Sequence, residues 1–211
     1  FLRLFVEAFP AAVGQWHFAL WWLAAITMVV GNLTALRQRN LKRLLAYSSI
    51  AHAGYLLITV VVGVGEGVER AVSGSGAMLF YLFAYTLATM GAFAVLSGLS
   101  EAGDRGVDLD DYSGLWTVRP GLTLAMSVFM LALLGFPVFG GIGFFAKWYL
   151  LQAALYGGAA PQTRLAVILV VTSVVSAGYY LYVVSAMFMR NRAADAPEPA
   201  RVGPLTNAVV A

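Results

Sequence analysis

The chain has 211 residues, of which 61% are hydrophobic and 11% are charged, and its formal net charge is +3. A soluble domain carries roughly 25% charged residues, so this composition excludes an ordinary soluble enzyme or a nucleic-acid-binding domain and indicates an integral membrane protein. The apolar runs are much longer than the ~10-residue alternating strands of a membrane barrel, so we expect an all-α polytopic helix bundle.

The chain begins at Phe1 within residues 1–10, which indicate the tail of a helix that ends at Pro10, so we expect a piece of a longer polytopic protein. We expect a transmembrane domain over residues 1–189 and, after it, a polar segment with the start of a further helix over residues 190–211. The apolar runs predict membrane spans at 16–36, 44–64, 77–99, 120–156 and 165–189.

The span over residues 120–156 is far longer than the ~20 residues that cross a membrane. Pro137 removes a backbone donor inside this run, and glycines on both sides of it relax the backbone. We therefore predict one discontinuous helix, with a non-helical interruption between Gly135 and Gly143.

Lys147 is the single charged residue between Arg119 and Arg164. A lone cation beside an interrupted membrane helix is typical of ion pathways in transporters. The alternative is a lysine whose long side chain extends to the membrane surface. Because the interruption lets the chain fold back, Lys147 can lie inside the protein, and we favour a function in ion transfer.

His52 stands near the middle of the second span, on a helical face that also carries Ser48, Tyr55 and Thr59. A polar face with an imidazole at its centre can hold a proton and pass it on. Hydrogen bonding between helices is the structural alternative, and it is stronger for Tyr85 at mid-depth of the third span.

The distribution of Lys and Arg predicts the orientation of the spans. Nine of them lie in segments 37–43, 100–119 and 190–201, and two, Arg70 and Arg164, lie in the alternate loops. By the positive-inside rule we expect the three basic segments to face the cytoplasm. The positive-inside rule also explains the presence of Lys42 and Arg43 at the cytoplasmic end of the second span. We interpret Tyr179, Tyr180 and Tyr182 as packing residues or interfacial anchors.

A family pattern is visible in segments 31–55, 83–93, 108–115 and 135–149. Together they resemble the antiporter-like membrane subunits of respiratory complex I, the proton-pumping NADH:quinone oxidoreductase, and among these the subunit N group. The resemblance implies half of a fold with two inverted repeats, each holding one broken helix. The chain would run from about the end of helix eight to the start of helix fourteen.

The resemblance also implies site residues. Lys147 corresponds to the terminal lysine of the second half-channel, His52 to a proton-relay residue, and Tyr85 to a position where the sister subunit M has histidine. The ten residues from Pro137 to Lys147 exceed the family's usual spacing of about eight.

On this basis we expect a proton-translocating subunit of NADH:quinone oxidoreductase in the inner (plasma) membrane, with other membrane-arm subunits and lipid as partners. The chain has no cysteine, so we expect no redox centre or metal site in it. NADH, FMN, iron–sulfur clusters and quinone would then be bound by other subunits. The alternatives are a subunit of an Mrp-type cation/proton antiporter and a structural membrane scaffold.

Overall fold

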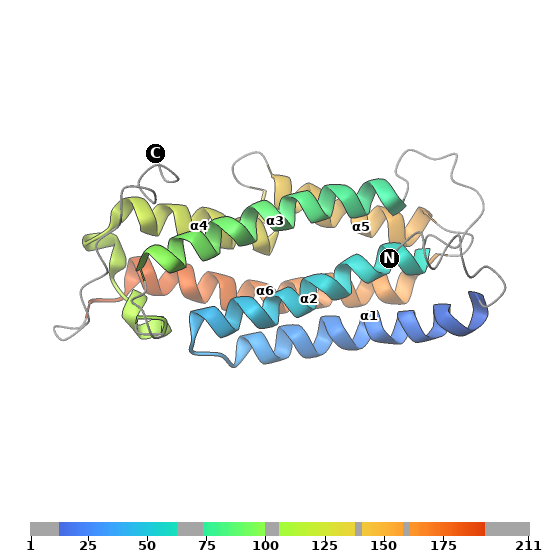
Figure 1. Ribbon diagram of the computed structural model, residues 1–211, viewed down its shortest axis with the longest axis horizontal. Helices are drawn as coiled ribbons and strands as arrows, with labels where there is room; N and C mark the ends of the chain where they lie inside the picture. The colour runs from blue at the N-terminus through green and yellow to red at the C-terminus, as the bar shows by residue number, and fades with distance from the viewer. Residues whose placement is uncertain (1–12, 63–73, 100–105, 138–140, 158–160, 193–211) are drawn as a thin grey trace.

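The computed structural model describes residues 13–62, 74–99, 106–137, 141–157 and 161–192. Within these ranges the chain forms α-helices and short 3₁₀ helices and no β-strand (Figure 1). The elements are α1 (Val13–Leu36), α2 (Leu41–Val62), α3 (Gly74–Leu99), η3 (Leu109–Tyr112), η4 (Leu115–Thr117), α4 (Pro120–Leu134), α5 (Ile142–Tyr156) and α6 (Thr163–Met189).

The predicted all-α membrane fold is confirmed. Helices α1, α2, α3 and α6 are each long and apolar enough to cross a membrane, which agrees with four of the predicted spans. Helix α3 begins three residues earlier than predicted, at Gly74. The expected helix end at Pro10 and the expected helix start within residues 190–211 lie outside the described residues.

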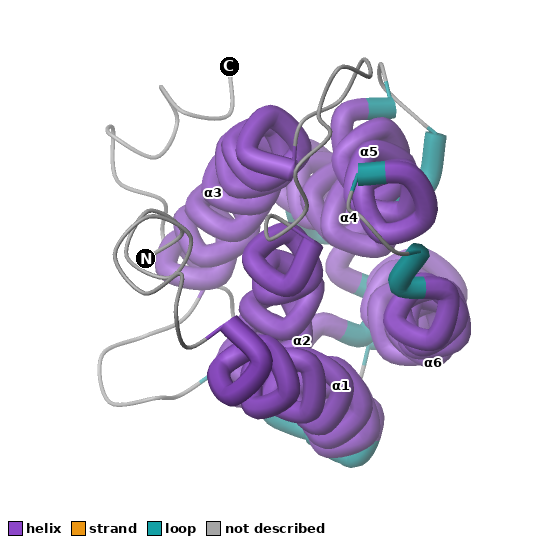
Figure 2. The backbone as a smooth tube through the Cα atoms, turned by 90° about the vertical axis from the view of Figure 1, so that its right-hand side faces the viewer, coloured by secondary structure: helices purple, strands orange, loops and turns teal. Residues whose placement is uncertain are grey.

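Helix α2 is the centre of the bundle. Figure 2 shows it surrounded by α1, α3, α5 and α6, and each of these helices packs against it. In the most apolar 18-residue stretch of α2, 61% of the stretch is buried inside the protein, against 33% to 39% in the other three long helices. A side chain at mid-length of α2, such as His52, therefore faces protein rather than lipid on most sides.

The described parts of the three basic segments, residues 37–43, 106–119 and 190–192, meet at one end of the bundle, on the left in Figure 1. The backbone amide of Leu41 donates to the carbonyl of Val107 at 2.8 Å, and that of Leu109 donates to the carbonyl of Arg39 at 2.7 Å. The guanidinium of Arg190 lies 3.5 Å from the carboxylate of Asp110. We call this end the basic end; the common position of the three segments agrees with the predicted alternation of loops.

The predicted interruption of the fourth span is confirmed, because α4 ends at Leu134 and α5 begins at Ile142. Gly135 takes a left-handed conformation with φ of 83°, and its amide donates to the carbonyl of Ala132 at 3.1 Å. Each half has 15 residues, about 22 Å at ~1.5 Å per residue. Since the hydrocarbon core is ~30 Å thick, neither half crosses it alone.

The two halves of the broken helix touch where Gly143 meets Ala132. A Cβ atom on Gly143 would lie 1.9 Å from the carbonyl oxygen of Ala132, so glycine alone fits this contact. The first turn of α5 is thereby held against the carbonyl end of α4. Lys147 follows one turn later and is directed back to the break.

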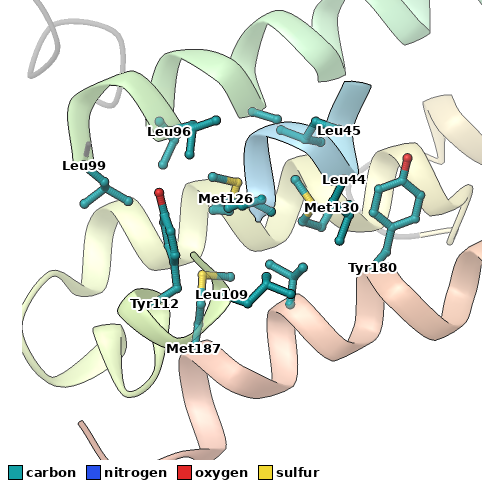
Figure 3. Packing of buried hydrophobic residues seen from close by; sticks show 14 of the residues in the cluster. Leu44, Leu45, Leu96, Leu99, Leu109, Tyr112, Met126, Met130, Tyr180 and Met187 are labelled. Atoms are coloured by element: carbon teal, nitrogen blue, oxygen red, sulfur yellow. The ribbon is translucent and has the colours of Figure 1, made fainter. Parts of the chain in front are cut away.

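The buried apolar side chains form two clusters, one toward each end of the bundle. The cluster toward the basic end packs leucines and methionines of α2, α3, α4, η3 and α6 (Figure 3). The other cluster joins Trp16 and Leu20 of α1 to buried residues of α2, α3, α5 and α6. Along α2, His52 falls between the residues of the first cluster and those of the second, so it lies in a polar layer between two apolar ones.

We expect Gly143→Ala to destabilise the protein by about 1–3 kcal/mol, because the added methyl group collides with the backbone of Ala132. The measurement is the midpoint of thermal unfolding of the purified protein in detergent. Gly121→Ala is the matched control, since a Cβ there meets nothing within 4 Å. We expect the control to unfold at or slightly above the wild-type midpoint. Equal midpoints for the two variants would contradict the close approach of α4 and α5.

Candidate functional site

The three residues singled out in the sequence, His52, Tyr85 and Lys147, line one small cavity in the middle of the bundle. They come from α2, α3 and α5. The cavity volume is about 10 Å³, which is close to the space that one water molecule needs. The rest of its wall is Tyr81, Leu133 and the small residues Ala84, Ala88, Ala132, Gly143 and Ala146.

Lys147 binds the end of the broken helix. Its ammonium donates to the carbonyl oxygen of Leu134, the last residue of α4, at 2.7 Å. The last carbonyls of a helix lack partners within the helix and carry the negative end of its dipole, so a cation is stabilised there. Nζ also lies 5.5 Å from the ring centroid of Tyr55, a cation–π distance. Lys147 is thus turned into the bundle instead of toward one of its ends.

His52 is 3% exposed, and tyrosine hydroxyls bind both of its ring nitrogens. Nδ1 lies 2.6 Å from the hydroxyl of Tyr81, and Nε2 lies 3.3 Å from that of Tyr180. A phenol can donate or accept, so either neutral tautomer of the imidazole is satisfied. His52 can therefore take up a proton at one nitrogen and release one at the other.

Tyr85 contacts His52 through its ring. The two rings are stacked, with centroids 4.8 Å apart and an interplanar angle of 28°. The stacked ring forms one wall of the cavity and fixes the plane of the imidazole.

A second polar network joins α1, α2 and α6 next to this cavity. Asn32, which is 1% exposed, donates from Nδ2 to the carbonyl of Met28 at 2.8 Å and to the hydroxyl of Tyr55 at 3.1 Å. Its Oδ1 accepts from the hydroxyl of Tyr179 at 3.0 Å. The hydroxyl of Tyr55 donates to Oγ1 of Thr172 at 3.3 Å. Because the ring of Tyr55 faces Lys147, the network begins at the cavity.

The polar face of α2 divides into two kinds of residue. Ser48 and Thr59 are buried, and their hydroxyls bond to backbone carbonyls of their own helix. His52 and Tyr55, between them, bond to side chains of other helices. These bonds of Ser48 and Thr59 stay within α2, so they are not the interhelical hydrogen bonds of the structural alternative. His52 and Tyr55 bond between helices and form the site.

Several site residues were missed or misjudged from the sequence. The sequence left Tyr179 and Tyr180 as either packing residues or interfacial anchors. Both are at most 2% exposed and pack in the core, so the interpretation as interfacial anchors is wrong for both. Tyr182 is exposed and contacts Arg190 at the basic end. Tyr81 could have been noticed, because it precedes Tyr85 by one helical turn on the same face.

The part of the chain that the structure describes contains no group of three or more His, Asp or Glu side chains placed to hold a metal ion. The groups gathered at the site are an imidazole, an ammonium, phenols and an amide. Of these the imidazole can exchange protons at its two nitrogens, and each phenol can donate and accept at the same oxygen, which is the requirement for handing a proton along.

Comparison with known proteins gives consistent matches. Residues 1–188 match a family model described as NADH:quinone oxidoreductase/Mrp antiporter, transmembrane. NADH-quinone oxidoreductase subunit N of Gemmatimonas aurantiaca is 57% identical over 211 residues, which are 100% of this chain and 39% of that protein. The chain thus spans about two fifths of the length of this relative.

Solved structures agree in fold. A chain of respiratory complex I from Thermus thermophilus with bound aureothin is 41% identical, with a TM-score of 0.68 over 91% of this chain and 40% of that chain. A chain of the same organism's complex I with bound NADH is 23% identical, with a TM-score of 0.77 over 99% of this chain and 41% of that one, and shows the shared fold.

We expect Tyr81→Phe to destabilise the protein by about 1–3 kcal/mol, because it leaves a buried nitrogen of His52 without its 2.6 Å partner. Thermal unfolding in detergent measures the effect. Tyr156→Phe is the matched control, since Tyr156 is 72% exposed and should tolerate the change. A Tyr81→Phe midpoint equal to that of the control would show that the hydrogen bond adds nothing to stability.

Proposed function

The chain belongs to the NADH:quinone oxidoreductase/Mrp antiporter family, and from this premise we propose that it is part of a proton-translocating membrane-arm subunit of NADH:quinone oxidoreductase, of the subunit N type. The observation that supports proton transfer best is the common cavity of Lys147, His52 and Tyr85 beside the broken helix. As one subunit of an oxidoreductase, the chain would move protons while NADH, FMN, iron–sulfur clusters and quinone react elsewhere in the complex.

In this proposal Lys147 and His52 are the proton-carrying groups. The carbonyl of Leu134 stabilises the ammonium form of Lys147, and a proton leaving Lys147 needs an acceptor in the same cavity. His52 fills that part, because its two hydrogen bonds to phenols satisfy either tautomer. Two positive charges in so small a cavity repel each other, so a proton arriving at one group favours departure from the other. A charge change outside the chain can drive the transfer through the same repulsion.

The basic end would face the cytoplasm, with the chain in the inner (plasma) membrane. The support is the gathering of segments 37–43, 106–119 and 190–192 at that end, together with the positive-inside rule. The membrane domain would comprise residues 1–189, with other membrane-arm subunits as its neighbours. Residues 190–201 would form a cytoplasmic segment.

The second candidate is a subunit of an Mrp-type antiporter, since the family description includes both groups. The relative from Gemmatimonas aurantiaca, matched over the whole chain and named subunit N, favours the first candidate. A purely structural scaffold is the weakest alternative, because packing alone does not require a lysine inside the bundle beside a helix break.

We expect Lys147→Ala to abolish most NADH-driven proton uptake by vesicles containing the assembled complex, with coupled NADH oxidation falling in parallel. Lys147→Arg should also impair uptake, because arginine keeps its positive charge and cannot pass its proton on. Arg164→Ala is the control: it removes an exposed cation outside the cavity and should pump as wild type does. If Lys147→Arg pumps normally, Lys147 supplies a fixed charge and does not carry protons.

We expect Tyr85→Phe to keep the stacking on His52 and to remove only the hydroxyl. If that hydroxyl takes part in proton transfer, the rate of NADH-driven proton uptake falls steeply, because loss of acid–base assistance slows a proton-transfer step by roughly 10²–10⁴-fold. The measurement uses the same vesicles. Unchanged uptake would limit Tyr85 to positioning the imidazole.

A further inference from the structure

A second cavity lies at the basic end, between the α1–α2 turn, η3 and α6. Its volume is about 250 Å³, enough for several water molecules. Arg37, Gln38 and Arg39 of the turn bring polar groups to it, and Tyr179 of α6 forms part of its wall. The cavity thus meets both conditions for holding water, which are sufficient room and polar partners.

Two consecutive tyrosines of α6 join this cavity to the site. The side chains of Tyr179 and Tyr180 are hydrogen-bonded to each other through their hydroxyls. The hydroxyl of Tyr180 lies 3.3 Å from Nε2 of His52. The other ring nitrogen of His52 binds Tyr81, which lines the small cavity that it shares with Lys147. Side-chain hydrogen bonds therefore run from the wall of one cavity to the wall of the other.

Apolar side chains enclose this path. Tyr179 is 2% exposed and Tyr180 is 0% exposed. Both belong to the buried cluster toward the basic end, and Figure 3 shows Tyr180 among its leucines and methionines. Tyr179 also donates to Asn32, but a carboxamide neither gains nor loses a proton at ordinary pH. The bond to Asn32 therefore takes no proton away from the path.

We propose that Tyr179 and Tyr180 form a proton path between water in the cavity at the basic end and His52. The inference rests on the proposed function, in which His52 and Lys147 carry protons. It adds to that function the route by which a proton from the basic end, proposed to face the cytoplasm, reaches the site.

The path works because a phenol accepts and donates at the same oxygen. The hydroxyl hydrogen of Tyr179 is directed to Asn32 in one orientation and to Tyr180 in the other. In the second orientation Tyr179 accepts a proton from water in the cavity and releases its own to the oxygen of Tyr180. Tyr180 then releases its own proton to Nε2 of His52, whose Nδ1 keeps its hydrogen toward Tyr81. Each phenol loses one O–H bond and gains another, so both stay neutral and the added proton ends on the imidazole.

The test is the rate of NADH-driven proton uptake by vesicles that contain the assembled complex, measured per amount of complex. We expect Tyr179→Phe and Tyr180→Phe each to lower this rate at least several-fold, because loss of acid–base assistance slows a proton-transfer step by roughly 10²–10⁴-fold. The double variant should be no slower than the slower single variant, since a path broken once is already closed. Tyr182→Phe is the matched control on α6 and should stay near the wild-type rate, because its hydroxyl accepts from Arg190.

Wild-type uptake in either assembled single variant would overturn the path. A double variant slowed by the product of both single losses would also overturn it, because the two hydroxyls would then act separately. So would an equal loss in Tyr182→Phe, since removal of any tyrosine hydroxyl of α6 would then have the same effect. If Tyr180→Phe does not assemble, the comparison of Tyr179→Phe with Tyr182→Phe decides.

Lys147→Ala, measured beside these variants, separates the path from the proposed function. If Lys147→Ala loses uptake while Tyr179→Phe and Tyr180→Phe pump normally, the path alone is wrong. Normal uptake by Lys147→Ala would instead overturn the proposed role of Lys147.

Discussion

The hydrogen bond from Lys147 to the carbonyl of Leu134 satisfies two requirements that neither residue could meet alone. A helix that ends inside the hydrocarbon leaves carbonyls without partners, and an ammonium at the same depth lacks both solvent and counter-charge. Nζ of Lys147 lies 2.7 Å from the carbonyl oxygen of Leu134, so the carbonyl gains a donor and the ammonium gains an acceptor. The broken helix and its lysine are therefore one feature of the fold, and the contact of Gly143 with Ala132 sets the distance between them.

The surroundings of this feature leave room for about one water molecule. Small residues of α3, α4 and α5 reduce the cavity to about the volume of one water molecule, and apolar clusters close the bundle toward both ends. In so apolar a place electrostatic interactions between charged groups are stronger than in water. On the proposed function, a proton arriving at or leaving Lys147 or His52 would therefore change the charge state of the other residue.

The spans and the helix break were predictable because they depend on interactions within one segment, whereas the hydrogen-bond partners at the site depend on tertiary packing. Run length and the placement of Pro137 and its glycines predicted the break, because these effects act within the segment itself. Lys147 and His52 were recognisable as rare polar residues in apolar helices. The partners Tyr81, Tyr180 and Asn32 depend on which helices are neighbours and how each is rotated. A single sequence carries no direct signal for that.

The two polar networks have the same geometry and opposite chemistry. In each, a buried side chain stands between two tyrosine hydroxyls: His52 between Tyr81 and Tyr180, and Asn32 between Tyr55 and Tyr179. Geometry alone would make both of them paths for protons. The imidazole exchanges protons at both nitrogens and the carboxamide at neither atom, so the residue type at the centre decides whether a network of this geometry could pass a proton on. A polar layer can thus be continuous in hydrogen bonds, stable in hydrocarbon, and still conduct only where an exchangeable group is placed.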